Sequence, residues 1–121
     1  NVYIGGELRK YPVDGGEAVA SRPLPRPDNS SWDNRGRLLV ASHDDRLFAI
    51  LNGIPPDDGS PVDLKFRILA VDPETLESVT LLEREGPPMG GGTVAVEARG
   101  KLYIGSYAGD RIISFPLTLA P

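Results

Sequence analysis

The chain has 121 residues, of which 40% are hydrophobic and 25% charged, and its formal net charge is −4, a composition typical of one globular domain with a modest core. The negative charge, with no cluster of Lys and Arg, argues against a nucleic-acid partner, and the absence of cysteine excludes disulfides and thiolate metal sites. No apolar run approaches the roughly 18 residues that a membrane-spanning helix needs, so we predict no membrane insertion.

Fourteen glycines and twelve prolines interrupt the chain so often that short strands and turns are favoured over helices. Nowhere do apolar residues recur at helical spacing over three turns, whereas many segments alternate with period two. In chain order, we expect strands at 1–6, 7–13, 17–22, 30–34, 37–42, 46–51, 65–71, 78–84, 93–98, 101–106 and 111–117.

An internal repeat organises these strands. Segments 1–6, 37–42 and 101–106 share one apolar pattern, and the last two follow polar turns that end in Gly36 and Gly100. Each repeat therefore predicts a hairpin that continues into a middle and an outer strand, which makes a four-stranded antiparallel meander. Such a unit is a blade of a β-propeller.

The predicted fold is all-β, a partial β-propeller of about two and a half blades, and a simple β-sandwich is the alternative. We expect a single domain over 1–121, with blade segments at about 1–24, 25–86 and 87–121. Because a ring needs about four to eight blades, the chain should require a partner. That partner would be a second copy, in a homo-oligomer, or the missing blades. The chain starts at Asn1 and its only methionine is Met89, so we expect that its start was set either by natural processing or by an artificial cut.

Asp28 and Asn29 are the first candidate site residues, because they stand just before an expected inner strand. Side chains there would point into the central channel of a propeller. A carboxylate beside a carboxamide offers two hard oxygen ligands of the kind that Ca²⁺ prefers. The alternative is an ordinary turn or cap, which the spacing alone favours.

His43 is the chain's only histidine and follows the repeated strand 37–42. It is either a catalytic group or a partly exposed polar residue, and its register leaves open which end of the blade it occupies. Asp44 and Asp45 could orient it, although a solvated acidic loop is the simpler interpretation.

Two further stretches are interpreted as structural. The glycines of 89–93 lack the Gly-Lys-Ser/Thr and the helix of a phosphate-binding loop, so we expect them to let the backbone enter a crowded inner strand. The insert 44–64 is expected to form a rim loop, and a solvated loop is the favoured interpretation of its acidic residues Asp57, Asp58 and Asp63 over a cation site.

The stretches 27–33, 37–43, 92–96 and 100–105 resemble, in order and spacing, the C-terminal blades of serum paraoxonases and arylesterases, which are calcium-dependent β-propeller hydrolases. The broader gluconolactonase and strictosidine-synthase relatives look similar. The resemblance implies that Asp28 and Asn29 bind the catalytic Ca²⁺, that His43 lines the pocket and that Asp28 also serves as a base. The substrate would be a small ester or lactone, whose carbonyl the metal polarises.

The chain also departs from the family. The family's remaining calcium ligands and its candidate catalytic histidines would lie before Asn1, and the insert 44–64 is longer than the family's equivalent. The sequence therefore predicts a C-terminal portion of a calcium-dependent hydrolase of esters or lactones, incomplete by itself. The alternative is a non-catalytic propeller segment that acts as a structural or interaction module.

Overall fold

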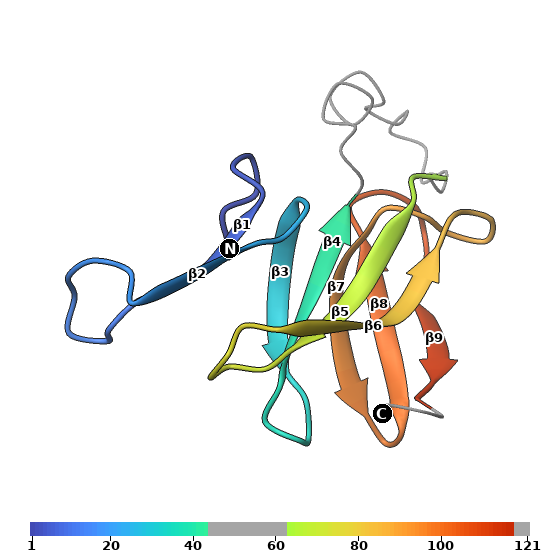
Figure 1. The fold of residues 1–121 in the computed structure, drawn as a ribbon. Helices are drawn as coiled ribbons and strands as arrows, with labels where there is room; N and C mark the ends of the chain where they lie inside the picture. Colours follow the sequence, from blue (N-terminus) through green and yellow to red (C-terminus); the bar gives the residue numbers. More distant parts are fainter. Residues whose placement is uncertain (44–62, 118–121) are drawn as a thin grey trace.

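The computed structural model describes residues 1–43 and 63–117. All regular secondary structure in these two ranges is β-strand, and the nine strands form three antiparallel sheets of two, four and three strands (Figure 1). The prediction of an all-β fold is confirmed. In the described ranges, no helix is long and apolar enough to cross a membrane.

The middle sheet is a complete four-stranded meander. Its strands β3 (Pro27–Trp32), β4 (Leu38–His43), β5 (Phe66–Val71) and β6 (Ser78–Arg84) are paired in sequence order. The tight turns form where the sequence predicts them. Asp33 Oδ1 accepts hydrogen bonds from the backbone N–H groups of Arg35 and Arg37, and Gly36 supplies a φ of 77°, which glycine adopts without steric cost.

The other two sheets flank this meander. On one side, β7 (Gly92–Ala98), β8 (Lys101–Ser106) and β9 (Ile113–Pro116) repeat the first three strands of the pattern. On the other side, β1 (Glu7–Lys10) pairs with β2 (Ala20–Pro23), and this pair lies to the left in Figure 1. Each sheet falls within one of the three expected segments.

The two central strands of the middle sheet, β4 and β5, are buried on both faces, which explains why they are almost continuously apolar. One face contributes Leu39, Ala41, Phe66, Ile68 and Ala70 to a cluster with Met89, Ala95, Leu102 and Ile104 of the β7–β9 segment. The opposite face contributes Val40, Leu69 and Val71 to a second cluster with Leu8 and Leu24. The β7–β9 sheet is thus packed on one face of the middle sheet, and residues of the N-terminal segment cover part of the other face, while the outer strand β6 stays largely exposed.

Side-chain hydrogen bonds join the first strands of two successive sheets. Asn29 Nδ2 donates to the carbonyl oxygen of Thr93 at 3.0 Å, and Ser31 Oγ donates to that of Ala95 at 2.6 Å. The residue numbers rise by two on both strands from the first pair to the second, so β3 and β7 lie side by side and run in the same direction (Figure 1).

Several expected strand boundaries were wrong, since β1, β2 and β9 are each shorter than expected, and two of the differences bear on the candidate site. Residues 1–6 do not form a strand. They make a turn that is closed by a bridge between Val2 and Glu7, and they form no ladder with any strand in the described ranges. The first strand of the middle sheet begins at Pro27 rather than Ser30, so Asp28 and Asn29 lie within β3. The expected strand 46–51, and Asp44, Asp45, Asp57 and Asp58, lie outside the described residues.

Candidate functional site

Asp28 and Asn29 form a β-bulge at the start of β3. Pro27 pairs with Ser42 and Ser30 pairs with Val40, so two residues of β3 stand opposite one residue of β4, Ala41. Regular strand geometry would send neighbouring side chains to opposite faces of the sheet, and a bulge relaxes this alternation. The predicted pair therefore occupies an irregular position at one edge of the sheet.

Asp28 is half-buried, and its carboxyl group has a raised pKa. Burial, which disfavours the charged form, is the main cause, while the nearby His43 and the backbone N–H of Asn29 oppose it. Its backbone carbonyl accepts a hydrogen bond from the side-chain amide of Asn1. The carboxylate is thus held where its negative charge is poorly solvated.

Asn29 has an exposed side chain with one amide function already in use. Its Nδ2 is bound to the Thr93 carbonyl, which leaves Oδ1 as the atom that could bind a cation. The amide therefore connects two sheets and can still offer one hard oxygen.

His43 lies at the same edge, because β4 runs antiparallel to β3 and ends where β3 begins. This answers the register question that the sequence left open. The ring is 2% exposed, Nε2 lies 2.7 Å from the carbonyl oxygen of Gly92, and Nδ1 lies 3.0 Å from the hydroxyl of Tyr3. The structure therefore places His43 near Asp28 but inside a hydrogen-bonded cluster rather than on an open surface.

Tyr3 interacts electrostatically with both Asp28 and Tyr107. Burial raises the pKa of Tyr3, the charge of Asp28 and the neighbouring Tyr107 raise it further, and Arg26 opposes them. Burial also raises the pKa of Tyr107. Both phenols therefore stay neutral at neutral pH and remain hydrogen-bond donors.

Gly92 has the role that was expected of the glycine-rich stretch. A Cβ at this position would lie 2.6 Å from two ring carbons of Phe66 and 3.0 Å from Ile104 Cγ2. Only glycine lets the start of β7 pack against the core while its carbonyl reaches His43. The stretch therefore supplies a close approach of backbone to a buried ring.

The donor set at this edge suits a hard cation in kind but is incomplete in number. Asp28 and Asn29 offer a carboxylate and a carboxamide oxygen, whereas Ca²⁺ takes about six to eight oxygens. Within the described residues, no group of three or more His, Cys, Asp or Glu side chains is placed to hold a metal ion. Asp63 lies near Gly86, away from this pair in the sequence and in its contacts.

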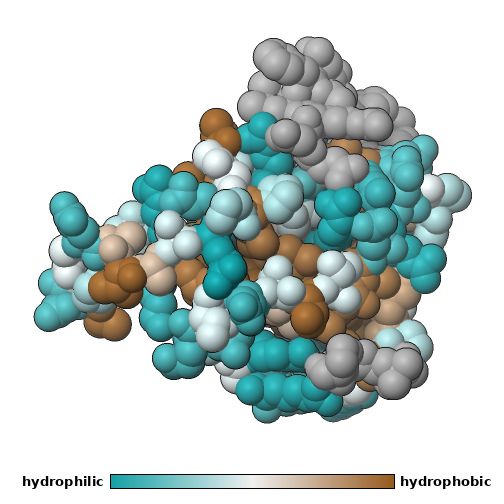
Figure 2. Space-filling model, in the orientation of Figure 1, coloured by the Kyte–Doolittle hydropathy of each residue, from teal (hydrophilic) through white to brown (hydrophobic). Residues whose placement is uncertain are grey.

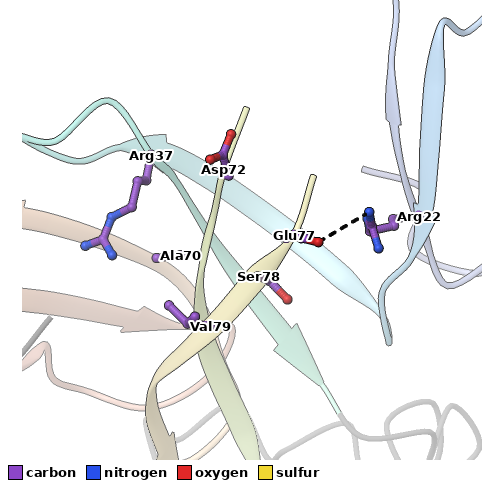
Figure 3. A pocket seen from close by; sticks show the side chains of 7 residues that line it. All are labelled: Arg22, Arg37, Ala70, Asp72, Glu77, Ser78 and Val79. Carbon is purple, nitrogen blue, oxygen red and sulfur yellow. Dashed lines mark ion pairs between the residues drawn. The ribbon is translucent and has the colours of Figure 1, made fainter. Parts of the chain in front are cut away.

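A surface pocket lies elsewhere, beside the middle sheet (Figure 3). In this pocket Arg22 lies 4.0 Å from Glu77, and its Nε donates to the Thr75 carbonyl at 3.1 Å. Contacts of this kind fasten β2 to the turn between β5 and β6. The lining contains none of the predicted site residues. It consists of Arg22, Arg37, Ala70, Asp72, Glu77, Ser78 and Val79.

Comparison with protein-family models, curated proteins and solved structures found no match for this chain.

Tyr3 and Tyr107 are site neighbours that the sequence predictions missed. Tyr107 could have been found, since the repeat that aligns Gly36 with Gly100 also aligns His43 with Tyr107. The same offset aligns Asp28 with Gly92. Tyr3 carries no such signal, because it belongs to a turn that lies outside the repeat pattern as observed.

Proposed function

We propose that this chain is a segment of a β-propeller that supplies Asp28 and Asn29 as Ca²⁺ ligands to a hydrolase of esters or lactones. The propeller interpretation is supported by the complete meander β3–β6, by the packing of the β7–β9 sheet against it and by the common direction of β3 and β7. Successive blades of a propeller pack in this manner, with their first strands around a common axis.

One observation supports the calcium assignment more than any other. The bulge in β3 places a half-buried carboxylate of raised pKa beside a carboxamide, at the edge that His43 also reaches. A carboxylate that is poorly solvated gains stability when a cation binds it. When bound, Ca²⁺ would act as a Lewis acid on a substrate carbonyl.

The chain's own residues would have three tasks in such a site. Asp28 binds the cation, Asn29 offers Oδ1 while its Nδ2 holds the carbonyl of the neighbouring strand, and the neutral phenol of Tyr3 lies near Asp28. The remaining oxygens would come from other residues of the full protein or from a second copy.

Calorimetric titration of Ca²⁺ tests this proposal. The unmodified chain should bind Ca²⁺, and Asp28→Ala should weaken binding by at least about tenfold, the effect of losing about 1.4 kcal/mol of ligand interaction. Asp14→Ala is the matched control, because Asp14 is an exposed carboxylate in the loop between β1 and β2. Equal affinity in the Asp28→Ala and Asp14→Ala variants would contradict the proposal.

A second function, that of a non-catalytic interaction module, is favoured by the way these polar groups are used. Asn29 and His43 both make hydrogen bonds between sheets, so each has a structural role without any metal. Exposed apolar residues such as Val96 and Tyr103 on the outer side of the β7–β9 sheet could contact another chain. Figure 2 shows that hydrophobic side chains also reach the surface on the face in view.

Mass measurement in solution and a hydrolysis assay separate the two functions. An oligomer that hydrolyses aryl esters or lactones only with Ca²⁺ supports the enzyme. An oligomer that neither binds Ca²⁺ nor hydrolyses these substrates supports the interaction module.

A further inference from the structure

The chain's single histidine is held by a tyrosine from the N-terminal turn. The hydroxyl of Tyr3 lies 3.0 Å from Nδ1 of His43, and the two rings meet edge to face with centroids 5.8 Å apart. Tyr3 is itself fixed, because Arg26 Nη1 donates to the backbone carbonyls of Tyr3 and Ile4 at 3.5 and 2.5 Å. The contact is therefore built from two segments that lie about forty residues apart in the chain.

The hydrogen-bond partners define the tautomer of His43. The Gly92 carbonyl can only accept a hydrogen bond, so Nε2 must carry a proton. In the neutral ring Nδ1 is then an acceptor, and the Tyr3 hydroxyl donates to it. Both ring nitrogens are occupied and the residue is 2% exposed, so neither nitrogen faces a water or a substrate.

We propose that His43 is a positioning residue, held in its Nε2–H tautomer by Tyr3, which ties the end of β4 to the bulged start of β7 and thereby fixes the Thr93 carbonyl that orients the side-chain amide of Asn29. The assignment of Asn29 and Asp28 as ligands rests on the proposed function. The tie itself does not, because it follows from the two hydrogen bonds of the ring.

The start of β7 explains how a tie at Gly92 affects Asn29. Gly92 pairs with Ser106 and Val94 pairs with Gly105, so Thr93 is the extra residue of a second bulge. His43 binds the carbonyl just before Thr93, and Asn29 binds the carbonyl of Thr93 itself. Loss of the first bond frees the bulge that orients the amide of Asn29, and with it the oxygen that is left for a cation.

Nuclear magnetic resonance of protein labelled with ¹⁵N-histidine tests the tautomer directly, because the chain has one histidine and should give one imidazole. We expect the proton on Nε2, with slow exchange against solvent. Tyr3→Phe removes the hydroxyl that donates to Nδ1, so the Nδ1 resonance should shift toward that of an unprotonated nitrogen that accepts no hydrogen bond. Tyr103→Phe, the same chemical change on the exposed side of β8, should leave it in place. A proton on Nδ1 alone, or equal spectra for the two variants, would overturn the proposal.

Calcium affinity tests the positioning role with two variants of the histidine. Glutamine retains an amide N–H that can donate to the Gly92 carbonyl, so His43→Gln should bind Ca²⁺ within about threefold of the unmodified chain, while His43→Ala should bind about tenfold more weakly. Equal losses in both variants would refute positioning. If the unmodified chain binds no Ca²⁺, the proposed function fails, whereas the resonance experiment still decides the tie between Tyr3, His43 and Gly92.

Discussion

Ser31 donates its hydroxyl hydrogen to the carbonyl oxygen of Ala95 at 2.6 Å, although the two residues are 64 positions apart in the chain. The same offset relates the turn glycines Gly36 and Gly100, so Ser31 and Ala95 hold equivalent places in successive sheets. The repeat is therefore joined to itself by side-chain hydrogen bonds as well as by apolar packing.

Removing this hydroxyl should destabilise the stack of sheets. Ser31→Ala leaves the partly buried Ala95 carbonyl without its donor, which costs about 1 kcal/mol in the free energy of unfolding. Urea unfolding should show a lower midpoint at unchanged slope. Ser30→Ala is the control, because Ser30 is exposed and should stay within about 0.5 kcal/mol of the unmodified chain. Equal effects of the two changes would show that the bond between sheets contributes nothing.

Much of the fold could be predicted from the sequence because its signals are local. The expected strand ranges 78–84 and 101–106 agree with β6 and β8, and the turn at Asp72 forms through hydrogen bonds from the backbone N–H groups of Glu74 and Thr75. Period-two alternation and turn residues act over a few positions, so one sequence suffices to find them.

The candidate site was less predictable because its geometry depends on distant partners. The bulge at Asp28 and Asn29 arises from pairing with β4, and the Tyr3 hydroxyl meets His43 only after the N-terminal turn packs over the sheet edge. Segment 1–6 has a strand pattern but pairs with no strand of the part of the chain that the structure describes, and the hydrogen bonds of a ladder need a partner strand. Local pattern cannot report such tertiary effects.

The turn at Asp33 should depend on pH. Burial alone would raise the pKa of this carboxyl group, but hydrogen bonds from Arg37 and Arg35 outweigh burial and the pKa is lowered. The Asp33 carboxylate therefore stabilises the fold fully above the ordinary Asp pKa of about 4. This stabilisation is lost as the pH falls through the lower, folded-state pKa.

Asp33→Asn tests this expectation. Since the side chain is fully buried and bonded to the Arg37 guanidinium at 2.7 Å, the substitution should cost about 2 kcal/mol at pH 7. The difference from the unmodified chain should shrink in acid. Asp72→Asn, in an exposed turn of the same kind, should cost clearly less. A difference that does not change with pH would contradict the ionic explanation.

Gly92 should tolerate no side chain. In Gly92→Ala the new Cβ would meet the Phe66 ring at 2.6 Å, which forces the core or the start of β7 to shift and costs about 1–3 kcal/mol. Gly105→Ala is the matched control in the same sheet, since its Cβ would lie 3.3 Å from Val94 Cγ1. Thermal unfolding should show the larger loss for Gly92→Ala. Equal loss in the two variants would mean that the close approach to Phe66 is unimportant.

Asp28 should weaken the fold when no cation is present. Burial raises the pKa of its carboxyl group, so the folded state binds a proton more tightly than the unfolded state. The contribution of Asp28 to stability is then most favourable below the unfolded-state pKa of about 4. It is lost as the pH rises through the raised, folded-state pKa. With a chelator at pH 7, Asp28→Asn should therefore melt at a higher temperature than the unmodified chain, and the two melting temperatures should converge in acid.

Added Ca²⁺ should reverse the order of the two melting temperatures at pH 7, because only the carboxylate is stabilised by the ion. A variant that melts lower than the unmodified chain in chelator would show that the charge of Asp28 stabilises the fold by itself, and the physical basis for a cation at this edge would then be removed.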